Sequence, residues 1–282
     1  MSNIETLNSS LSVSLVSTEW LGKNIKKVRI IDASWHLPNT NRNAYEEFEK
    51  EHLENSIFFD IDKNSNHNSE LPHMLTKKKE WENIISNYGI KNSDHVVVYD
   101  NSDIISSCRV WYNFLYFDHN PNLISVLDGG LFKWKKENRS LTYKVPIFKK
   151  SKYMANENFS LVLNKSQINN NIKNNLFDLV DARSKNRFLG KVHEQRKELR
   201  SGNIEGSKSL PYSKLINSSD RTFKNKNEII DIFFKHKINV NKSIAFTCGS
   251  GITACVLGLA NSIISGKKPI IYDGSWAEYG KK

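Results

Sequence analysis

The chain has 282 residues, of which 38% are hydrophobic and 11% aromatic, a composition that excludes a disordered chain and allows two ordinary domains. Its net charge of +11 comes from lysines scattered in short sets, without a basic stripe or a DNA-binding motif. We therefore expect a positive, solvated surface that attracts anionic substrates and acidic protein partners, and no nucleic-acid partner.

Several classes of protein are disfavoured by what the sequence lacks. It contains no apolar run of about 18 residues, so we expect no membrane segment. Residues 1–17 have neither a basic region before an apolar stretch nor an arginine, which favours a cytoplasmic location over secretion or import into an organelle. The three cysteines, Cys108, Cys248 and Cys255, lack zinc-like spacing and a disulfide framework. The histidines show no metal spacing either, so we expect no metal and no cofactor.

Short apolar strands recur along the chain, separated by helical patterns such as residues 76–88 and 224–236. Three residues in each half close such a strand at corresponding places: Asp32, Asp100 and Asp128 in the first half, and Asp181, Cys248 and Asp273 in the second. This correspondence indicates an internal duplication at the scale of a domain.

The alternation of strands and helices predicts an α/β protein whose two tandem domains each contain a mainly parallel sheet flanked by helices. We place the first domain at residues 1–145, a lysine-rich linker at 146–158 and the second domain at 159–282. The Asn- and Lys-rich residues 164–175 are interpreted as exposed surface. In such sheets the functional crevice lies at the carboxyl ends of the strands, where Cys248 is placed.

Cys248 is the strongest candidate for a catalytic residue. It ends an apolar strand, residues 244–247, and is followed by a loop containing Gly249 and Gly251 and then by an apolar helix. Inward-turned amides of such a loop and the positive end of the helix favour a thiolate. The alternative is a buried strand-end thiol, which would not need this loop. Cys255, on the following helix, is interpreted as a core residue.

Five segments carry a family resemblance. They are residues 48–62 with His52, residues 73–75, residues 106–111, residues 181–196 and residues 272–280. With these segments the chain resembles the tandem rhodanese sulfurtransferases over nearly its whole length, and within them the 3-mercaptopyruvate sulfurtransferases. The resemblance implies a first domain without a nucleophile, since Asp100 stands at the cysteine position. It also implies that sulfur moves from 3-mercaptopyruvate through a Cys248 persulfide to a thiol such as thioredoxin, or to cyanide.

The loop after the cysteine separates the subfamilies. Members that prefer thiosulfate usually carry arginine and lysine there, whereas members that prefer mercaptopyruvate carry glycine and serine, as Gly249 and Ser250 do here. Two cations beside the thiolate suit the thiosulfate dianion, and a keto acid with one negative charge can be held farther away. We therefore expect 3-mercaptopyruvate as the sulfur donor.

The same resemblance assigns roles to further residues. Arg187 and Arg196 are expected to bind the carboxylate and keto oxygen of the substrate, because planar guanidinium groups offer matched donors. Ser250, His73 and Asp62 are expected to form a proton relay across the domain interface. The rest of the expected binding loop consists of Gly249, Gly251, Ile252 and Thr253.

Three alternatives to a 3-mercaptopyruvate sulfurtransferase remain. The first is a thiosulfate sulfurtransferase on the same scaffold. The second is a related phosphatase, which is disfavoured because Ala254 stands where an arginine would close the loop around phosphate. The third is a non-catalytic module that relays persulfide sulfur between partners, which would not need both candidate arginines and Ser250.

Overall fold

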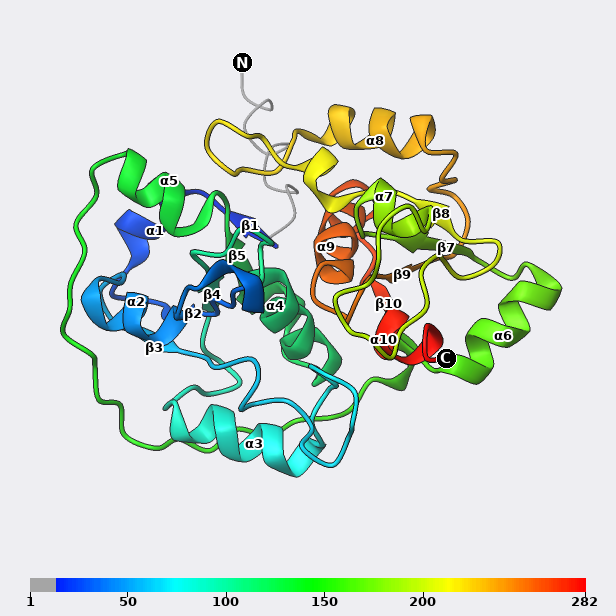
Figure 1. Cartoon of the computed structure of the whole chain (residues 1–282). Coiled ribbons are helices and arrows are strands. Elements are labelled where there is room, and N and C mark those ends of the chain that lie inside the picture. The colour runs from blue at the N-terminus through cyan, green and yellow to red at the C-terminus, as the bar shows by residue number, and fades with distance from the viewer. Residues whose placement is uncertain (1–13) are drawn as a thin grey trace, which may run out of the picture.

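The computed structural model describes residues 14–282, which form two parallel five-stranded sheets, one in each half of the chain (Figure 1). In the first sheet the strands are ordered β1 (Leu15–Val16), β5 (Ile124–Leu127), β4 (Val96–Tyr99), β2 (Arg29–Asp32) and β3 (Ser56–Phe58). In the second the order is β6 (Val162–Leu163), β10 (Ile270–Tyr272), β9 (Ile244–Thr247), β7 (Asp178–Asp181) and β8 (Lys208–Ser209). The two orders are equivalent, so the structure confirms the predicted α/β fold and its duplication.

Helices flank both sheets. The first half contains α1 (Thr18–Asn24), α2 (Ala44–Lys50), α3 (Lys78–Asn87), α4 (Ser107–Tyr116) and α5 (Gly130–Lys136). The second half contains α6 (Lys165–Asn174), α7 (Lys185–Phe188), α8 (Lys226–Lys235), α9 (Ala254–Ser265) and α10 (Ser275–Tyr279). None of the helices within residues 14–282 is long and apolar enough to cross a membrane. Between α5 and the 3-10 turn at Phe159–Leu161, the chain forms no regular element beyond a bridge from Thr142 to His52.

The registers show why the two halves place equivalent residues together. Asp32 pairs with Tyr99, and Asp181 pairs with Thr247. The next residues along the central strands β4 and β9 are therefore Asp100 and Cys248, at the carboxyl ends of their sheets. Because both sheets are parallel, the loops after the other strands gather at the same edge.

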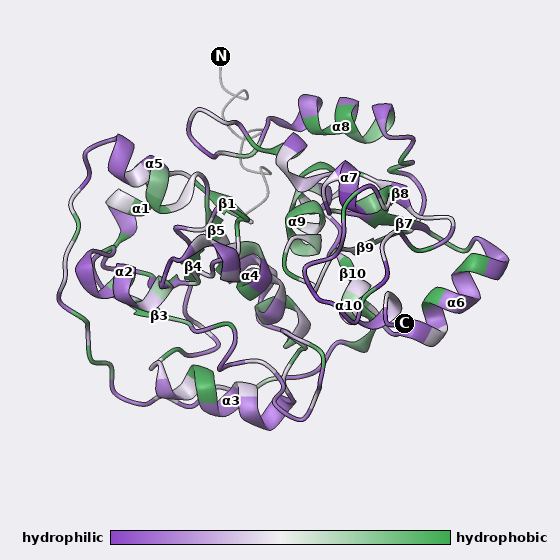
Figure 2. Ribbon diagram, in the orientation of Figure 1, coloured by the Kyte–Doolittle hydropathy of each residue, from purple (hydrophilic) through white to green (hydrophobic). Residues whose placement is uncertain are grey.

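A continuous apolar core joins the two halves through α4 and α9, which contact each other between the sheets (Figure 1). All ten residues of α4 are buried, and α9 is buried from Ala254 to Ser262. Cys108 and Cys255 lie in this core, which confirms the interpretation of Cys255. Figure 2 shows hydrophobic residues gathered in α9, whereas the outer helices α3, α6 and α8 combine hydrophilic and hydrophobic residues.

Residues 164–175 are mostly exposed, as the sequence predicted, and most of them form the helix α6. Asn164 caps its first turn by accepting a hydrogen bond from the Gln167 amide, and the Gln167 side chain accepts one from the Asn164 amide. Asn175 ends the helix in a left-handed conformation. Ile168 packs into the core. Asn164 and Asn175 therefore cap the two ends of a helix, which a prediction from composition overlooks.

Candidate active site

A cavity of about 390 Å³ lies where the two domains meet at the carboxyl ends of the strands. The first domain contributes Trp35, Leu37, Pro38 and Ile104 to its wall, and the second contributes Arg183, Ser184, Arg187, Glu194, Gln195, Arg196, Leu199, Tyr212, Cys248, Gly249, Ser250, Ile252 and Thr253. Most of the sequence-predicted site residues are therefore brought together. A cavity of this size accommodates a small organic anion.

Cys248 reaches the cavity from the end of β9 and is only 2% exposed. Its backbone amide donates a hydrogen bond to Ser275 Oγ at 3.2 Å, and Ser275 in turn donates to the Tyr272 carbonyl at 2.8 Å. The nucleophile is thus fixed against the start of α10. Because Cys248 lines the cavity, a reagent can approach it from there.

The carbonyl groups of the loop after Cys248 are turned outward by neighbouring donors. The Cys248 carbonyl accepts from the Trp276 amide at 3.0 Å, and the Gly249 carbonyl accepts from the Ala277 amide at 2.9 Å. In a planar trans peptide the N–H points opposite to the C=O, so the amides of Gly249 and Ser250 point away from α10. Within residues 14–282 the amides of residues 249–253 donate to no acceptor. They remain available to stabilise an anion on or beside Cys248.

Gly251 has a different role from its neighbours in the loop, because it does not line the cavity. Its φ of 82° lies in the left-handed region that favours glycine, and an added Cβ would stand 2.9 Å from Arg109 Nη1. The Gly251 carbonyl accepts from Arg109 Nη1 at 3.4 Å and from Cys255 Sγ at 3.2 Å. This glycine shapes the loop and gives it a close contact with the first domain.

Ser250, His73 and Asp62 form a hydrogen-bonded chain across the domain interface, which we call the relay. His73 Nδ1 lies 2.9 Å from Ser250 Oγ, and His73 Nε2 lies 3.0 Å from Asp62 Oδ1. With the proton on Nε2 facing the carboxylate, Nδ1 accepts the hydrogen bond of the serine hydroxyl. The sequence placed these three residues far apart, at 62, 73 and 250, and only the fold brings them into contact.

Trp35 holds the relay in place from the first domain. Its ring packs edge-on against the His73 ring with centroids 4.8 Å apart, and its Nε1 donates to Asp62 Oδ2 at 2.8 Å. The hydrogen bond from His73 holds the pKa of Asp62 below its usual range, helped by Trp35 and by the positive charge of Arg196. Asp62 is therefore ionised at neutral pH and orients the imidazole.

The two expected substrate arginines both line the cavity, but their surroundings differ. Arg187, on α7, donates to Glu194 from Nε at 3.3 Å and from Nη2 at 2.6 Å. Its guanidinium lies against the nucleophile loop, with Nη2 3.3 Å from where a Cβ on Gly249 would stand. Within the described residues Arg196 forms no ion pair, and it acts on Asp62 only through its field.

Sequence reasoning missed four residues that organise this site: Arg183, Glu194, Arg109 and Asp273. Arg183 and Glu194 lie within the recognised segment 181–196, and their buried pairing, at 2.9 Å, follows from no spacing rule. Arg109 is buried in α4 and donates to Asp273 Oδ1 at 2.7 Å, and it also donates to the His73 carbonyl. The sequence identifies Asp273 as a strand-end residue of the duplication, and this position is the signal that points to it.

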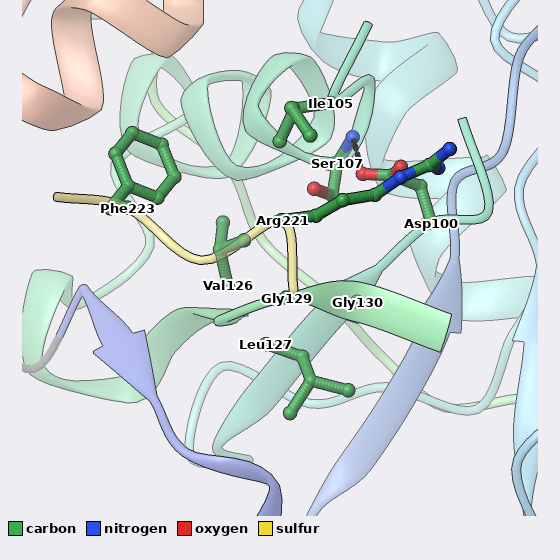
Figure 3. Close-up of a pocket in the computed structure, with 9 residues that line it drawn as sticks. All are labelled: Asp100, Ile105, Ser107, Val126, Leu127, Gly129, Gly130, Arg221 and Phe223. Atoms are coloured by element: carbon green, nitrogen blue, oxygen red, sulfur yellow. Dashed lines mark hydrogen bonds between the residues drawn. The ribbon is translucent and has the colours of Figure 1, made fainter. Parts of the chain in front are cut away.

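The equivalent loop of the first domain is closed (Figure 3). The Asp100 carboxylate accepts hydrogen bonds from the amides of Ser102 at 2.8 Å and Ser107 at 2.9 Å. Arg221 of the second domain lies beside Asp100 and binds Asp103 Oδ1 at 2.6 Å. The space left here is about 10 Å³, room for a single water at most. The Asp100 carboxylate therefore already accepts the hydrogen bonds that the amides of this loop can donate to an anion.

Within the described residues, no three histidine, cysteine, aspartate or glutamate side chains gather as metal ligands would. The groups that the cavity itself offers are a thiol nucleophile, free amide donors, guanidinium groups and the relay.

Comparisons with known proteins show the family to which the chain belongs. A family model for the rhodanese-like domain matches residues 17–137 and 164–282. The 3-mercaptopyruvate sulfurtransferase of Rattus norvegicus is 34% identical over 274 residues, covering 94% of this chain and 91% of the relative. The thiosulfate sulfurtransferase of the same species is also 34% identical, over 277 residues, covering 95% and 92%.

A solved structure extends the likeness to three dimensions. The crystal structure of SseA from Escherichia coli, described with the rhodanese fold and catalytic mechanism of 3-mercaptopyruvate sulfotransferases, has a TM-score of 0.84 at 30% identity and covers 93% of this chain and 98% of that one. Both domains, and the cysteine loop between β9 and α9, fall within the matched residues. The chain therefore belongs to the rhodanese-like family, as a sulfurtransferase with two rhodanese-like domains.

Proposed function

We propose that the protein transfers sulfur from 3-mercaptopyruvate, through a persulfide on Cys248, to a thiol acceptor and releases pyruvate. The observation that carries this proposal is the relay, in which Ser250, two residues after the nucleophile, contacts His73 and, through it, Asp62. A thiosulfate dianion has no proton to move, whereas cleavage of 3-mercaptopyruvate leaves an enolate that needs one.

The first half-reaction uses the groups of the cavity in order. The Cys248 thiolate attacks the thiol sulfur of the substrate, an S–S bond forms, and the C–S bond breaks with its electron pair passing to the pyruvate enolate. Ser250, backed by His73, takes the proton of the substrate thiol and returns it to the terminal carbon of the enolate. Arg187 and Arg196 hold the carboxylate and keto oxygen. The free amides of residues 249–253 stabilise the resulting persulfide anion.

In the second half-reaction an acceptor thiolate attacks the outer sulfur of the persulfide. The S–S bond to Cys248 breaks, its electron pair regenerates the Cys248 thiolate, and the acceptor leaves as a persulfide. Because Cys248 is nearly buried and lines the cavity, a small thiol or a thioredoxin that presents an extended thiol suits this step, and cyanide would react in the same way. The cycle is of the ping-pong kind.

Mass spectrometry and donor kinetics test this proposal together. Exposure to 3-mercaptopyruvate without acceptor should add one sulfur atom to Cys248 and release one equivalent of pyruvate. Cys248→Ser should abolish both, while the core variants Cys108→Ser and Cys255→Ser should retain most of the activity. Pyruvate release by Cys248→Ser would refute the mechanism, and persulfide loading only from a protein donor would indicate a sulfur relay module instead.

The second candidate is a thiosulfate sulfurtransferase, favoured by the equal identity of the rat thiosulfate enzyme. Initial rates with thiosulfate and 3-mercaptopyruvate at matched concentrations separate the two. A higher catalytic efficiency, kcat/KM, with 3-mercaptopyruvate supports the proposal, and a higher kcat/KM with thiosulfate replaces it by this second candidate.

A further inference from the structure

The wall of the cavity carries more positively charged side chains than negatively charged ones. Three guanidinium groups line it, those of Arg183, Arg187 and Arg196. Arg183 is buried and forms a double contact with Asp181, from Nε at 3.0 Å and from Nη2 at 2.6 Å. Asp181 therefore balances the charge of Arg183, and the charge that faces a substrate depends on the other arginines and their partners.

Glu194 is the second carboxylate of this cluster. Its side chain is 2% exposed and accepts from Arg183 Nη1 at 2.9 Å and from Arg187 at 2.6 Å. Asp62 does not line the cavity, because its oxygens face His73 and Trp35. Asp181 and Glu194 thus pair with Arg183 and Arg187, whereas Arg196 forms no ion pair within the described residues and interacts with Asp62 only through its field.

We propose that Glu194 is a specificity-determining residue, which sets the charge of the cavity to match a substrate with one negative charge and to disfavour a dianion. This inference rests on the proposed function and concerns how the same site selects its donor. It needs no contact between Glu194 and the substrate. The carboxylate acts by cancelling the charge of Arg187, which is 37% exposed and lies against Gly249.

Charge balance discriminates between the two donors because the energy of an ion in a field is proportional to its charge. Removing the negative charge of Glu194 would strengthen binding of a dianion about twice as much, in free energy, as binding of a monoanion. In a partly desolvated cavity, one unit of charge a few ångströms away changes the relative use of the two anions by about tenfold or more.

The test is Glu194→Gln, which removes the charge and keeps a carbonyl oxygen that accepts from Arg187. We expect the ratio of kcat/KM for thiosulfate to that for 3-mercaptopyruvate to rise by about tenfold or more. Glu198→Gln is the matched control, since Glu198 is exposed, follows Glu194 by four residues and does not line the cavity, and it should leave the ratio unchanged. The double variant Glu194→Gln with Arg187→Gln restores the charge count and should return the ratio toward the wild-type value.

A second variant covers the case in which Glu194→Gln does not fold. Ser184→Lys adds a positive charge at an exposed position of the cavity wall and should shift the ratio in the same direction. An unchanged ratio in a folded Glu194→Gln or Ser184→Lys protein overturns the inference. Failure of the proposed function would appear separately, in the wild-type protein, as a preference for thiosulfate over 3-mercaptopyruvate.

Discussion

Asp100 and Cys248 each follow the central strand of their sheet and precede a buried helix. Asp100 uses the amides of Ser102 and Ser107 for its own carboxylate, and burial raises its pKa. The Cys248 loop leaves its amides without partners in the described residues. The residue at this position thus distinguishes the two loops. The amides of the first bind the Asp100 carboxylate, and the amides of the second can bind an anion that forms during the reaction.

Arg196 and Arg187 offer a test at the scale of single residues. Arg196→Ala and Arg187→Ala should each weaken transition-state binding of 3-mercaptopyruvate by about 2–4 kcal/mol, because each removes a charge-assisted contact from a cavity. The loss appears as a lower kcat/KM. Steady-state kinetics measure the loss. Arg200→Ala is the control, since Arg200 stacks on Trp276 and does not line the cavity.

The arginine effect should depend on the substrate carboxylate. A neutral organic trisulfide that loads the same persulfide should be used by Arg196→Ala nearly as well as by the wild-type protein. An equal loss with the neutral donor would show that the arginines maintain the structure and do not bind the substrate.

At the scale of elements, the loop between β9 and α9 decides the subfamily. Gly249 has no left-handed backbone, and an added Cβ there would meet only the flexible end of Arg187, at 3.3 Å. A Cβ at this position therefore needs only a small shift of the Arg187 side chain. Gly249→Arg with Ser250→Lys should raise thiosulfate activity and lower 3-mercaptopyruvate activity, because it adds two cations and removes the relay hydroxyl.

Gly249→Ala is the control for this loop variant, since it adds a Cβ without charge and should keep the donor preference. Initial rates with both donors follow a thermal melt that establishes folding. If the folded double variant keeps the wild-type preference, specificity is set outside the loop, by Arg187, Arg196 and Glu194.

The end of β2 gives a prediction on pH. Asp32 is buried, and this burial raises its pKa to about 6, although Ser34 donates to it through both amide and hydroxyl. The folded state therefore holds this proton more tightly than the unfolded chain, so its contribution to stability falls as pH rises from about 4 to about 6. Asp32→Asn, which stays neutral, should be more stable than the wild-type protein at pH 8 by on the order of 1–3 kcal/mol.

Urea unfolding at pH 4.5 and pH 8 measures the effect of Asp32→Asn. The gain should be largest at pH 8 and shrink at pH 4.5. The same change at exposed Asp231 should give no such pH-dependent difference. A gain that is equal at both pH values would assign it to packing and not to the charge.

The strands and their ends were predictable, because apolar runs closing on Asp32, Asp100, Asp181 and Cys248 carry the period of a buried parallel strand. The partners of these residues were not. Ser34 and Arg183 each follow an equivalent aspartate by two residues. The Ser34 hydroxyl donates to that aspartate, Asp32, whereas Arg183 also donates to a second carboxylate, that of Glu194. Such contacts depend on how loops fold over one another, and local sequence does not encode this.

For the whole molecule, the two domains share one core, and the site lies across their junction. Arg109 and Asp273 cross this junction as a buried ion pair at 2.7 Å, and the Leu75 amide donates to the same aspartate at 2.8 Å. The pair connects the segment that carries His73 to the loop that carries Ser250. Stability and relay geometry should therefore depend on the same contact.

Because the core is continuous, we expect the domains to unfold in a single transition. Trp fluorescence reports mainly the first domain, which has five of the six tryptophans, and far-UV circular dichroism reports both. Arg109→Met should move both curves together by about 3–5 kcal/mol, since it leaves Asp273 buried without its ion-pair partner. The exposed Lys78→Met control should change stability by about 0.5 kcal/mol or less. Separate transitions in the wild-type protein, or a shift of the fluorescence curve alone in Arg109→Met, would show that the domains fold independently and that the junction does not position the relay.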